Sequence, residues 1–289
     1  MLDSNLQRRL EITFASLNSK ASDFPGPMAL STELKKAIGV ISASGHNQIP
    51  VKPEVATLFT TAAIEMWQRS VHSFLISVSL TEASPIWTSV SGYYASHYAI
   101  RALAHLLGHF ELHQDSYIVE LELLANGTFA CTFKEKRKRD EREHLFYWKM
   151  VQKDSSFAAD PLLALGRDVN PDVKHRNRAN YADHIAGFPP FKVLNEQAVK
   201  NRVQHISSIP FSASPIPDPE EIPDPDKFPD IGSVQIIAYH RLVRFRQLLD
   251  EIIGGSNRFW DVHRNPSWAR GIIDFQLTEQ DGLRSFRDK

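Results

Sequence analysis

The sequence predicts a mainly α-helical protein with a small antiparallel β-sheet inserted into its helical part. Two observations predict the helices: apolar and polar residues recur at steps of three and four after Pro53, and again from about Trp87 to Phe110. A third observation predicts the sheet. The period changes to two on both sides of Asn126-Gly127, a dipeptide typical of two-residue hairpins.

The composition is that of a globular protein with almost no net charge. Hydrophobic residues make up 42% and charged residues 23%, and 33 basic against 34 acidic groups leave a formal charge of -1. Binding of nucleic acid would therefore depend on a local cluster of Lys and Arg. Cys131 is the only cysteine, which excludes an intrachain disulfide, and we identify neither a secretory signal nor a membrane span. We expect a cytoplasmic protein that does not interact with membranes.

Residues 1–50 are predicted to form an N-terminal helical cap, with short helices over residues 3–18 and 31–42. A stronger helix begins at Pro53, because proline suits the first turn of a helix. Its buried side is predicted to carry Leu58, Ala62, Met66, Phe74, Leu75 and Val78. The following helix, from about Trp87 to Phe110, would pack antiparallel to it.

The β insertion is predicted at about residues 116–151. Tyr117 to Leu124 and Thr128 to Lys134 have the pattern of strands, and Leu145 to Val151 is interpreted as a possible third strand. The turn after the second strand carries a basic run from Lys134 to Arg139. This run is interpreted as a solvated turn in preference to a phosphate contact, because acidic residues follow it immediately.

The C-terminal half contains further helical patterns at about residues 161–166, 173–186 and, more weakly, 192–206. Residues 209–230 hold seven of the 17 prolines, which predicts an extended linker. Beyond it lies a helix over Ser233 to Ile253 and a tail. The predicted division is therefore a domain at 51–208, the linker at 209–230 and a C-terminal part at 231–289.

Two segments are similar to patterns of the HEPN family. The first is Ser91 to Leu103, which contains Tyr93-Tyr94, His97 and Arg101-Ala102-Leu103. The second is Arg176 to Tyr181, with Ala179-Asn180-Tyr181 at its end, and the two segments occur in the family's order. The resemblance covers roughly residues 54–190 and implies a HEPN-like helical bundle, often dimeric, so a homodimer is expected.

The resemblance also implies an activity on RNA. Active HEPN proteins use an Arg and a His, about four to six residues apart, for RNA cleavage without a metal or cofactor. A base takes the 2'-hydroxyl proton while a guanidinium neutralises charge on the phosphate. By this resemblance the candidate catalytic residues are Arg176, Arg178 and His184, and the candidate RNA-binding residues are Asn177, Tyr181, His97 and Arg101.

The spacing of these residues does not decide which Arg and His would form the active pair. The position five after Arg176 is Tyr181, whereas Arg178 and His184 have a fitting spacing but Ala179 follows Arg178. One hypothesis is therefore an RNA-directed endoribonuclease of a toxin-antitoxin or anti-phage defence system, whose partners are RNA and an antitoxin. The alternative is a non-catalytic helical module that binds a protein or nucleotide partner.

A last pattern is the recurrence of His105, His109 and His113 at steps of four. This spacing is compatible with a metal site on one face of a helix. A solvated polar stripe is the favoured interpretation, because no Cys or carboxylate lies at ligand spacing.

Overall fold

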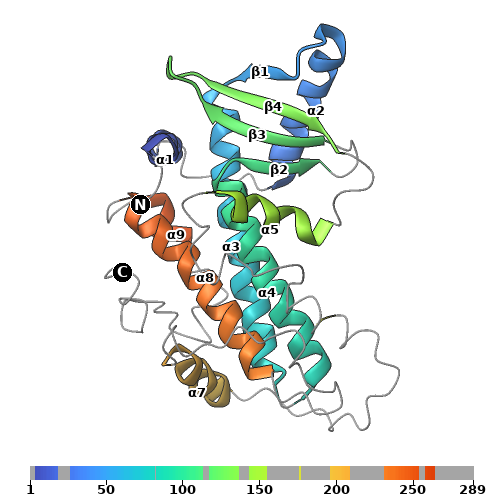
Figure 1. Ribbon diagram of the computed structural model, residues 1–289. Helices are drawn as coiled ribbons and strands as arrows, with labels where there is room; N and C mark the ends of the chain where they lie inside the picture. Colours follow the sequence, from blue (N-terminus) through green and yellow to red (C-terminus); the bar gives the residue numbers. More distant parts are fainter. Residues whose placement is uncertain are drawn as a thin grey trace. The chain divides into compact units, whose positions relative to one another are not determined.

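The computed structural model describes nine parts of the chain: residues 4–18, 27–81, 83–112, 117–136, 143–154, 176, 196–208, 231–253 and 258–263. Within them the chain is mainly helical and contains one four-stranded antiparallel sheet (Figure 1). The predicted fold class, mainly α with a small inserted sheet, is confirmed. In these parts of the chain, no helix has both the length and the hydropathy that crossing a membrane requires.

The chain forms two compact units. Unit 1 contains Met1–Trp67, Ile100–Ala164 and Phe245–Arg264, whereas unit 2 contains Gln68–Ala99, Leu165–Arg244 and Asn265–Lys289. The predicted linker at 209–230 lies outside the described residues. The predicted division of the chain at that linker therefore stays a prediction.

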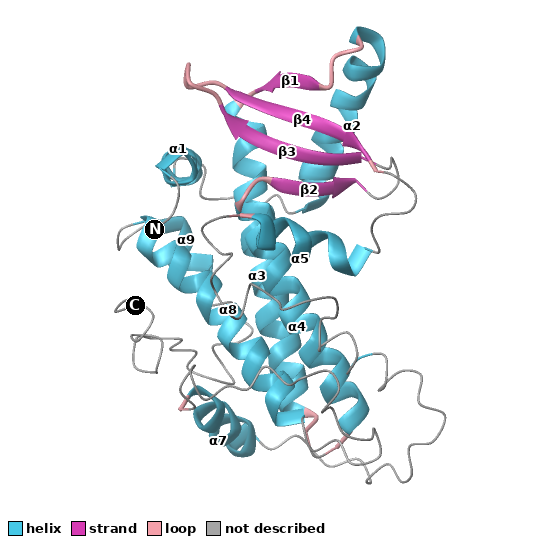
Figure 2. Cartoon of the chain, viewed as in Figure 1, coloured by secondary structure: helices cyan, strands magenta, loops and turns pink. Residues whose placement is uncertain are grey.

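The sheet belongs to unit 1 and has the strand order β1-β4-β3-β2 (Figure 2). All neighbouring strands are antiparallel, and their bounds are β1 Gln48–Val51, β2 His109–Leu112, β3 Tyr117–Leu123 and β4 Phe129–Glu135. The hairpin between β3 and β4 turns at the predicted place, but its loop has three residues, Ala125 to Gly127, and not two, because Leu124 N donates to Thr128 O at 2.9 Å. Gly127 has the positive φ of 81° that the last position of such a loop favours. The two outer strands, β1 and β2, were not predicted.

The predicted helix that ends at Phe110 is too long. Helix α4 spans Pro85–Leu106, and Gly108 adopts a φ of 92°, a left-handed conformation that commonly ends helices. β2 then begins at His109, so that Phe110 lies in the sheet core and not on a helical ridge. At its start, α4 is capped by Ser84, whose Oγ accepts a hydrogen bond from Trp87 N at 3.5 Å.

The predicted third strand at Leu145 to Val151 is wrong, because these residues form helix α5, Glu143–Lys153. Its aromatic and β-branched residues have strand propensity, but propensity is weaker than tertiary packing. Phe146, Tyr147, Trp148, Met150 and Val151 are all buried, so tertiary packing covers this helix on more than one side.

One face of the sheet packs on helix α2, Pro27–Ser44, and on the first half of helix α3, Pro53–Ser79 (Figure 2). Alternate strand residues point into this core, and they include Val119 and Leu121 of β3 and Cys131 of β4. The thiol of Cys131 is buried, which raises its pKa to about 12. The only cysteine is thus a packing residue.

Unit 1 has a second group of helices beside this sheet core. It includes α1, Ser4–Asn18, the end of α8, Ile231–Ile253, and α9, Arg258–His263. Trp260 of α9 lies 5.4 Å from Trp67 of α3 between ring centroids, and its indole donates a hydrogen bond to Asp250 of α8 at 2.6 Å. The aromatic packing fixes α9 against α3 and α8.

Unit 2 is a helical bundle of the second half of α3, the first part of α4, helix α7 (Glu196–Ser207) and most of α8. α3 and α4 form the predicted antiparallel pair, in which Ser77 Oγ donates to Thr88 O at 2.8 Å. Gln235 of α8 donates to Thr81 Oγ1 at 2.8 Å and accepts from Arg202 of α7 at 3.1 Å. One buried amide therefore links three segments of the bundle.

The end of α4 yields a stability prediction, because Gly108 lacks space for a side chain. A Cβ at this position would overlap Arg9 Nη1 and lie 2.8 Å from Leu121 O. Gly127 has a similar positive φ but open space around it. We expect Gly127→Ala to cost about 1 kcal/mol of unfolding free energy from backbone strain alone. Gly108→Ala should cost roughly 1–3 kcal/mol more, because overlap adds to the strain.

Urea unfolding of both variants measures this difference. Equal losses of stability in Gly108→Ala and Gly127→Ala would show that Arg9 moves aside without cost. The double change Arg9→Ala with Gly108→Ala separates the two contributions, since only the overlap with the guanidinium is relieved by the loss of Arg9.

Candidate functional site

Of the predicted catalytic residues, Arg176 belongs to the part of the chain that the structure describes. Its guanidinium lies over two tyrosines of α4 in unit 2. Its central carbon is 5.4 Å from the ring centroid of Tyr93 and 5.8 Å from that of Tyr94. These are cation–π distances, worth roughly 0.5–2 kcal/mol depending on desolvation. The two segments that resemble the HEPN family therefore contact each other through this arginine.

The tyrosines belong to an aromatic cluster on α4 that consists of Tyr93, Tyr94, His97 and Tyr98. The rings of Tyr93 and His97 are nearly parallel, with an angle of 11° and centroids 5.9 Å apart. Tyr94 and Tyr98 are also stacked, 5.8 Å apart. Residues three and four apart share a helix face, so these contacts follow directly from the helical spacing.

The four residues differ in their access to solvent. Tyr93 and His97 are buried, with 0% and 2% exposure, whereas Tyr94 and Tyr98 are partly exposed. His97 is thus placed to orient the cluster through its stacking on Tyr93. A ligand can reach the partly exposed rings of Tyr94 and Tyr98 in this cluster, and it can also reach Arg176 beside them.

Arg101, another predicted RNA-binding residue, belongs to unit 1. Its guanidinium lies 5.0 Å from the ring centroid of Tyr147 of α5. Burial raises the pKa of Tyr147 to about 12, although the positive charge of Arg101 opposes this shift. Arg101 therefore supports the packing of α5, and its predicted contact with RNA stays a prediction.

The remaining predicted site residues lie outside the described residues: Arg178 and His184 of the proposed catalytic group, and Asn177 and Tyr181 of the RNA-binding group. Their predicted roles stay predictions. In the described part, Arg176 Nε is buried and makes no hydrogen bond. The guanidinium of Arg176 thus retains donor capacity beyond its contacts with the tyrosine rings.

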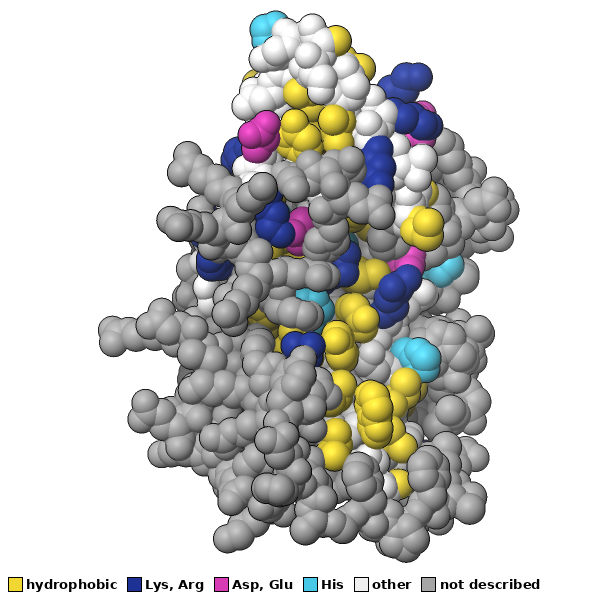
Figure 3. Space-filling model, turned by 90° about the vertical axis from the view of Figure 1, so that its right-hand side faces the viewer, with side chains coloured by type: hydrophobic (Ala, Val, Ile, Leu, Met, Phe, Trp, Pro, Cys, Tyr) yellow, Lys and Arg dark blue, Asp and Glu magenta, His cyan; other side chains and the backbone are white. Residues whose placement is uncertain are grey.

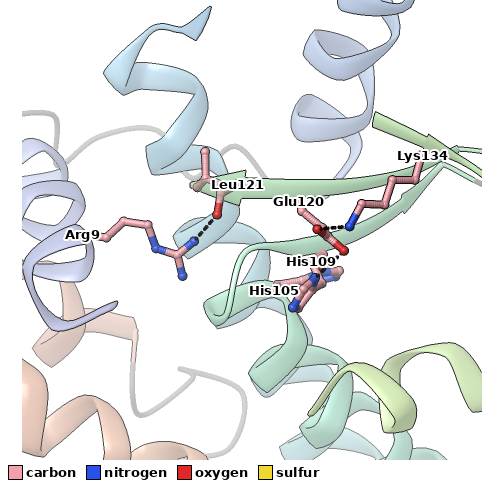
Figure 4. Close-up of polar contacts among 6 residues, drawn as sticks. All are labelled: Arg9, His105, His109, Glu120, Leu121 and Lys134. Carbon is pink, nitrogen blue, oxygen red and sulfur yellow. Dashed lines mark hydrogen bonds and ion pairs between the residues drawn. The ribbon is translucent and has the colours of Figure 1, made fainter. Parts of the chain in front are cut away.

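A second polar group lies in unit 1, where Arg9 of α1 reaches the end of α4 (Figure 4). Its guanidinium donates one hydrogen bond to Leu121 O at 3.2 Å and another to Leu106 O. Leu106 is the last residue of α4, where carbonyls lack helical partners and the helix dipole favours a cation. Burial lowers the pKa of Arg9 to about 10, which leaves it charged at neutral pH.

The predicted solvated stripe of His105, His109 and His113 is wrong for its first two members. His105 is fully buried near the end of α4, and His109 begins strand β2 (Figure 4). His105 Nδ1 lies 2.9 Å from His109 O, so Nδ1 carries the proton and donates it. His113 lies outside the described residues, and among those described no group of three or more His, Cys, Asp or Glu side chains is arranged to hold a metal.

The described lysines of the basic run are paired with carboxylates of strands β3 and β2. Lys134 Nζ lies 2.5 Å from Glu120 Oε2, and Lys136 pairs with Glu111 (Figure 4 for Lys134). The side chain of Glu111 is buried and that of Lys136 is 19% exposed. These ion pairs neutralise local charge, which argues against a phosphate-binding role for the two lysines.

Sequence reasoning missed two parts of these arrangements. Tyr93 was treated only as part of the family pattern, although its position one turn before His97 already indicates their contact. The role of Arg9 had no signal in the sequence, because its partners are backbone carbonyls 97 and 112 residues away.

His105 yields a prediction about pH. Burial is the main reason that its pKa falls from 6.5 to about 3 in the folded protein. As the pH drops below 6.5, the unfolded chain is protonated first, so the free energy of unfolding falls through the window down to about pH 3. His105→Phe removes this contribution and should reduce the loss of stability between pH 7 and pH 5 by about 2 kcal/mol.

Urea unfolding of both proteins at the two pH values measures this. Loss of the bond to His109 O should make the variant less stable at pH 7, by about 1 kcal/mol. An unchanged pH dependence in His105→Phe would contradict the assignment of a neutral buried imidazole.

Comparison with protein-family models, with curated proteins and with solved structures gives no match to the chain. The resemblance to the HEPN family therefore depends on the two segments described above and stays a hypothesis.

Proposed function

We propose that this chain is an RNA-directed, HEPN-like protein that cleaves RNA without a metal. The observation that supports the proposal best is the contact of Arg176 with Tyr93 and Tyr94. It joins the two segments that carry the family resemblance, and the contacting residues Tyr93, Tyr94 and Arg176 all belong to the helical unit 2.

In the proposed reaction His184 acts as the general base and takes the proton of a ribose 2'-hydroxyl. The 2'-oxygen attacks the adjacent phosphorus, the bond to the 5'-oxygen breaks, and that oxygen takes a proton from water and leaves as a 5'-hydroxyl end. The other end is a 2',3'-cyclic phosphate. Arg178 and Arg176 neutralise the charge that develops on the phosphate, a role for which an arginine's fork of donors is suited.

The setting of this activity is part of the same proposal. Cleavage of cellular or phage RNA fits a toxin controlled by an antitoxin, or an anti-phage defence protein, that acts in the cytoplasm as a homodimer. Recognition would involve Asn177 and Tyr181 of the Arg176 segment.

The proposal predicts metal-independent cleavage. Purified protein should cut RNA in the presence of a chelator and leave cyclic-phosphate ends, which gel analysis and end-group mapping detect. His184→Ala and Arg178→Ala should each lose most of this activity, by roughly a hundredfold or more, while they remain folded by circular dichroism. Retained cleavage in His184→Ala would exclude its role as the base.

Arg176 has a sharper test, because a lysine retains charge but not the planar fork. Arg176→Lys should keep the fold and part of the RNA affinity but lose cleavage, whereas Arg176→Gln should lose both functions. If Arg176→Gln cleaves RNA like the wild type, Arg176 is only a packing residue of the aromatic cluster.

The alternative is a non-catalytic binding module, and one observation favours it. The Arg176 guanidinium is already engaged by aromatic rings, and His97 beside them is buried. A protein with this function would bind RNA or another partner without cleaving it, and binding would survive His184→Ala.

A further inference from the structure

The accessible residues of α4 in unit 2 form a single stripe. From Trp87 to Tyr98, the described side chains that are not buried are Trp87, Ser91, Tyr94 and Tyr98. Their spacings are four, three and four, so that all lie on one side of the helix. This set is called the α4 stripe.

Three of the four members of the α4 stripe are aromatic. Trp87 is 57% exposed, which is unusual for a side chain whose burial stabilises a fold so strongly. The other described tryptophans, Trp67, Trp148 and Trp260, are buried. Figure 3 shows a face of the molecule on which hydrophobic side chains reach the surface beside Lys and Arg side chains.

The rings are already arranged for stacking. Tyr94 and Tyr98 lie 5.8 Å apart with an angle of 28° between their planes. Arg176 adds a cation 5.8 Å from the Tyr94 centroid. Ser91 is small and separates Trp87 from Tyr94 along the helix, so the stripe has one wider interval between its rings.

We propose that the α4 stripe is a stacking platform for the bases of single-stranded RNA. The inference rests on the proposed function and names its substrate class. Unpaired bases stack on Trp87 and Tyr98, while Tyr94, whose ring already stacks on Tyr98 and contacts Arg176, holds that arginine next to the phosphate backbone. From Trp87 to Tyr98 the helix axis rises by about 16 Å, which accommodates roughly four or five bases at a stacking distance of about 3.4 Å.

The chemistry of the stripe selects single strands over the other forms of RNA. Bases inside a duplex are stacked on each other, so their faces are closed to protein rings. Ring faces bind any base, which predicts weak sequence preference. A protein partner would also bury aromatic rings. The guanidinium of Arg176 beside the stacked rings of Tyr94 and Tyr98 favours RNA, because RNA carries negative charge along its backbone.

Fluorescence anisotropy with labelled RNA of about a dozen nucleotides tests the platform, with an unpaired strand and a hairpin duplex as probes. Measurements use the His184→Ala background to suppress cleavage by the protein, and a chelator to suppress metal-dependent contaminating nucleases. The wild-type stripe should bind the unpaired strand at least tenfold more tightly than the duplex. Trp87→Leu and Tyr98→Leu should each lose roughly five- to hundredfold of the affinity for the strand.

Two control variants make the test specific. Tyr98→Phe keeps the ring face and should bind like the parent. Val40→Ala changes a hydrophobic side chain of α2 that is exposed to a similar degree, 56%, and should leave affinity unchanged. Binding should also quench the tryptophan emission, and Trp87→Phe should remove most of that quenching.

The outcomes separate the platform from the proposed function. If RNA binds but the affinities of Trp87→Leu and Tyr98→Leu are unchanged, or if the duplex binds equally well, the platform is wrong and the RNA-directed function stands. If neither probe binds, both are wrong. Reduced self-association in the Leu variants with unchanged RNA affinity would instead assign the stripe to contacts between copies of the chain.

Discussion

In unit 1, helix α4 ends at Leu106, and the chain then turns at Gly108, a residue without a side chain that lies against a buried arginine, before the sheet begins at His109. Gly108 turns the chain through a positive φ, and the guanidinium of Arg9 occupies the space that a Cβ would need. Arg9 satisfies Leu106 O at the end of the helix and Leu121 O of β3. A single side chain thereby links the end of α4, where carbonyls lack helical partners, to strand β3 of the hairpin.

The polar groups around this point follow the same rule. His105 is kept neutral by burial and donates to His109 O, and Glu111 pairs with Lys136. Buried polar groups of this kind contribute little net stability when paired, but removal of one partner is costly. The stability of unit 1 therefore depends on every buried polar group having its partner more than on the strength of any one interaction.

Unit 2 uses its polar and aromatic groups differently. Its buried amide, Gln235, joins three helical segments, while Tyr94, Tyr98 and Trp87 remain accessible on one side of α4. In the proposed function Tyr94 holds Arg176, and Trp87 and Tyr98 offer their rings to bases. The proposed site thus places the cation and the stacking surface on the same few residues, and the accessible rings give the predicted preference for unpaired RNA.

The sequence determined the features that depend on local patterns. Pro53 and the steps of three and four located α3, which spans Pro53–Ser79, and Asn126-Gly127 located the hairpin. The proximity of Tyr93, Tyr94 and His97 also follows from helical spacing. The contact of Arg176 with these rings was implicit in the family resemblance, which placed the two segments in one bundle, but its geometry was not.

Tertiary structure alone decided the rest. Leu145 to Val151 has strand propensity but forms part of α5, in which its three consecutive aromatic residues are all buried by tertiary packing. His105 and His109 share a helical spacing, yet Gly108 lies between them and puts one on α4 and the other on β2. Arg9 binds carbonyls that no side-chain pattern reveals. Arg9 and its carbonyl partners are far apart in the sequence, and the space at Gly108 is limited by Arg9 and Leu121, so the local spacing of residues did not reveal these contacts.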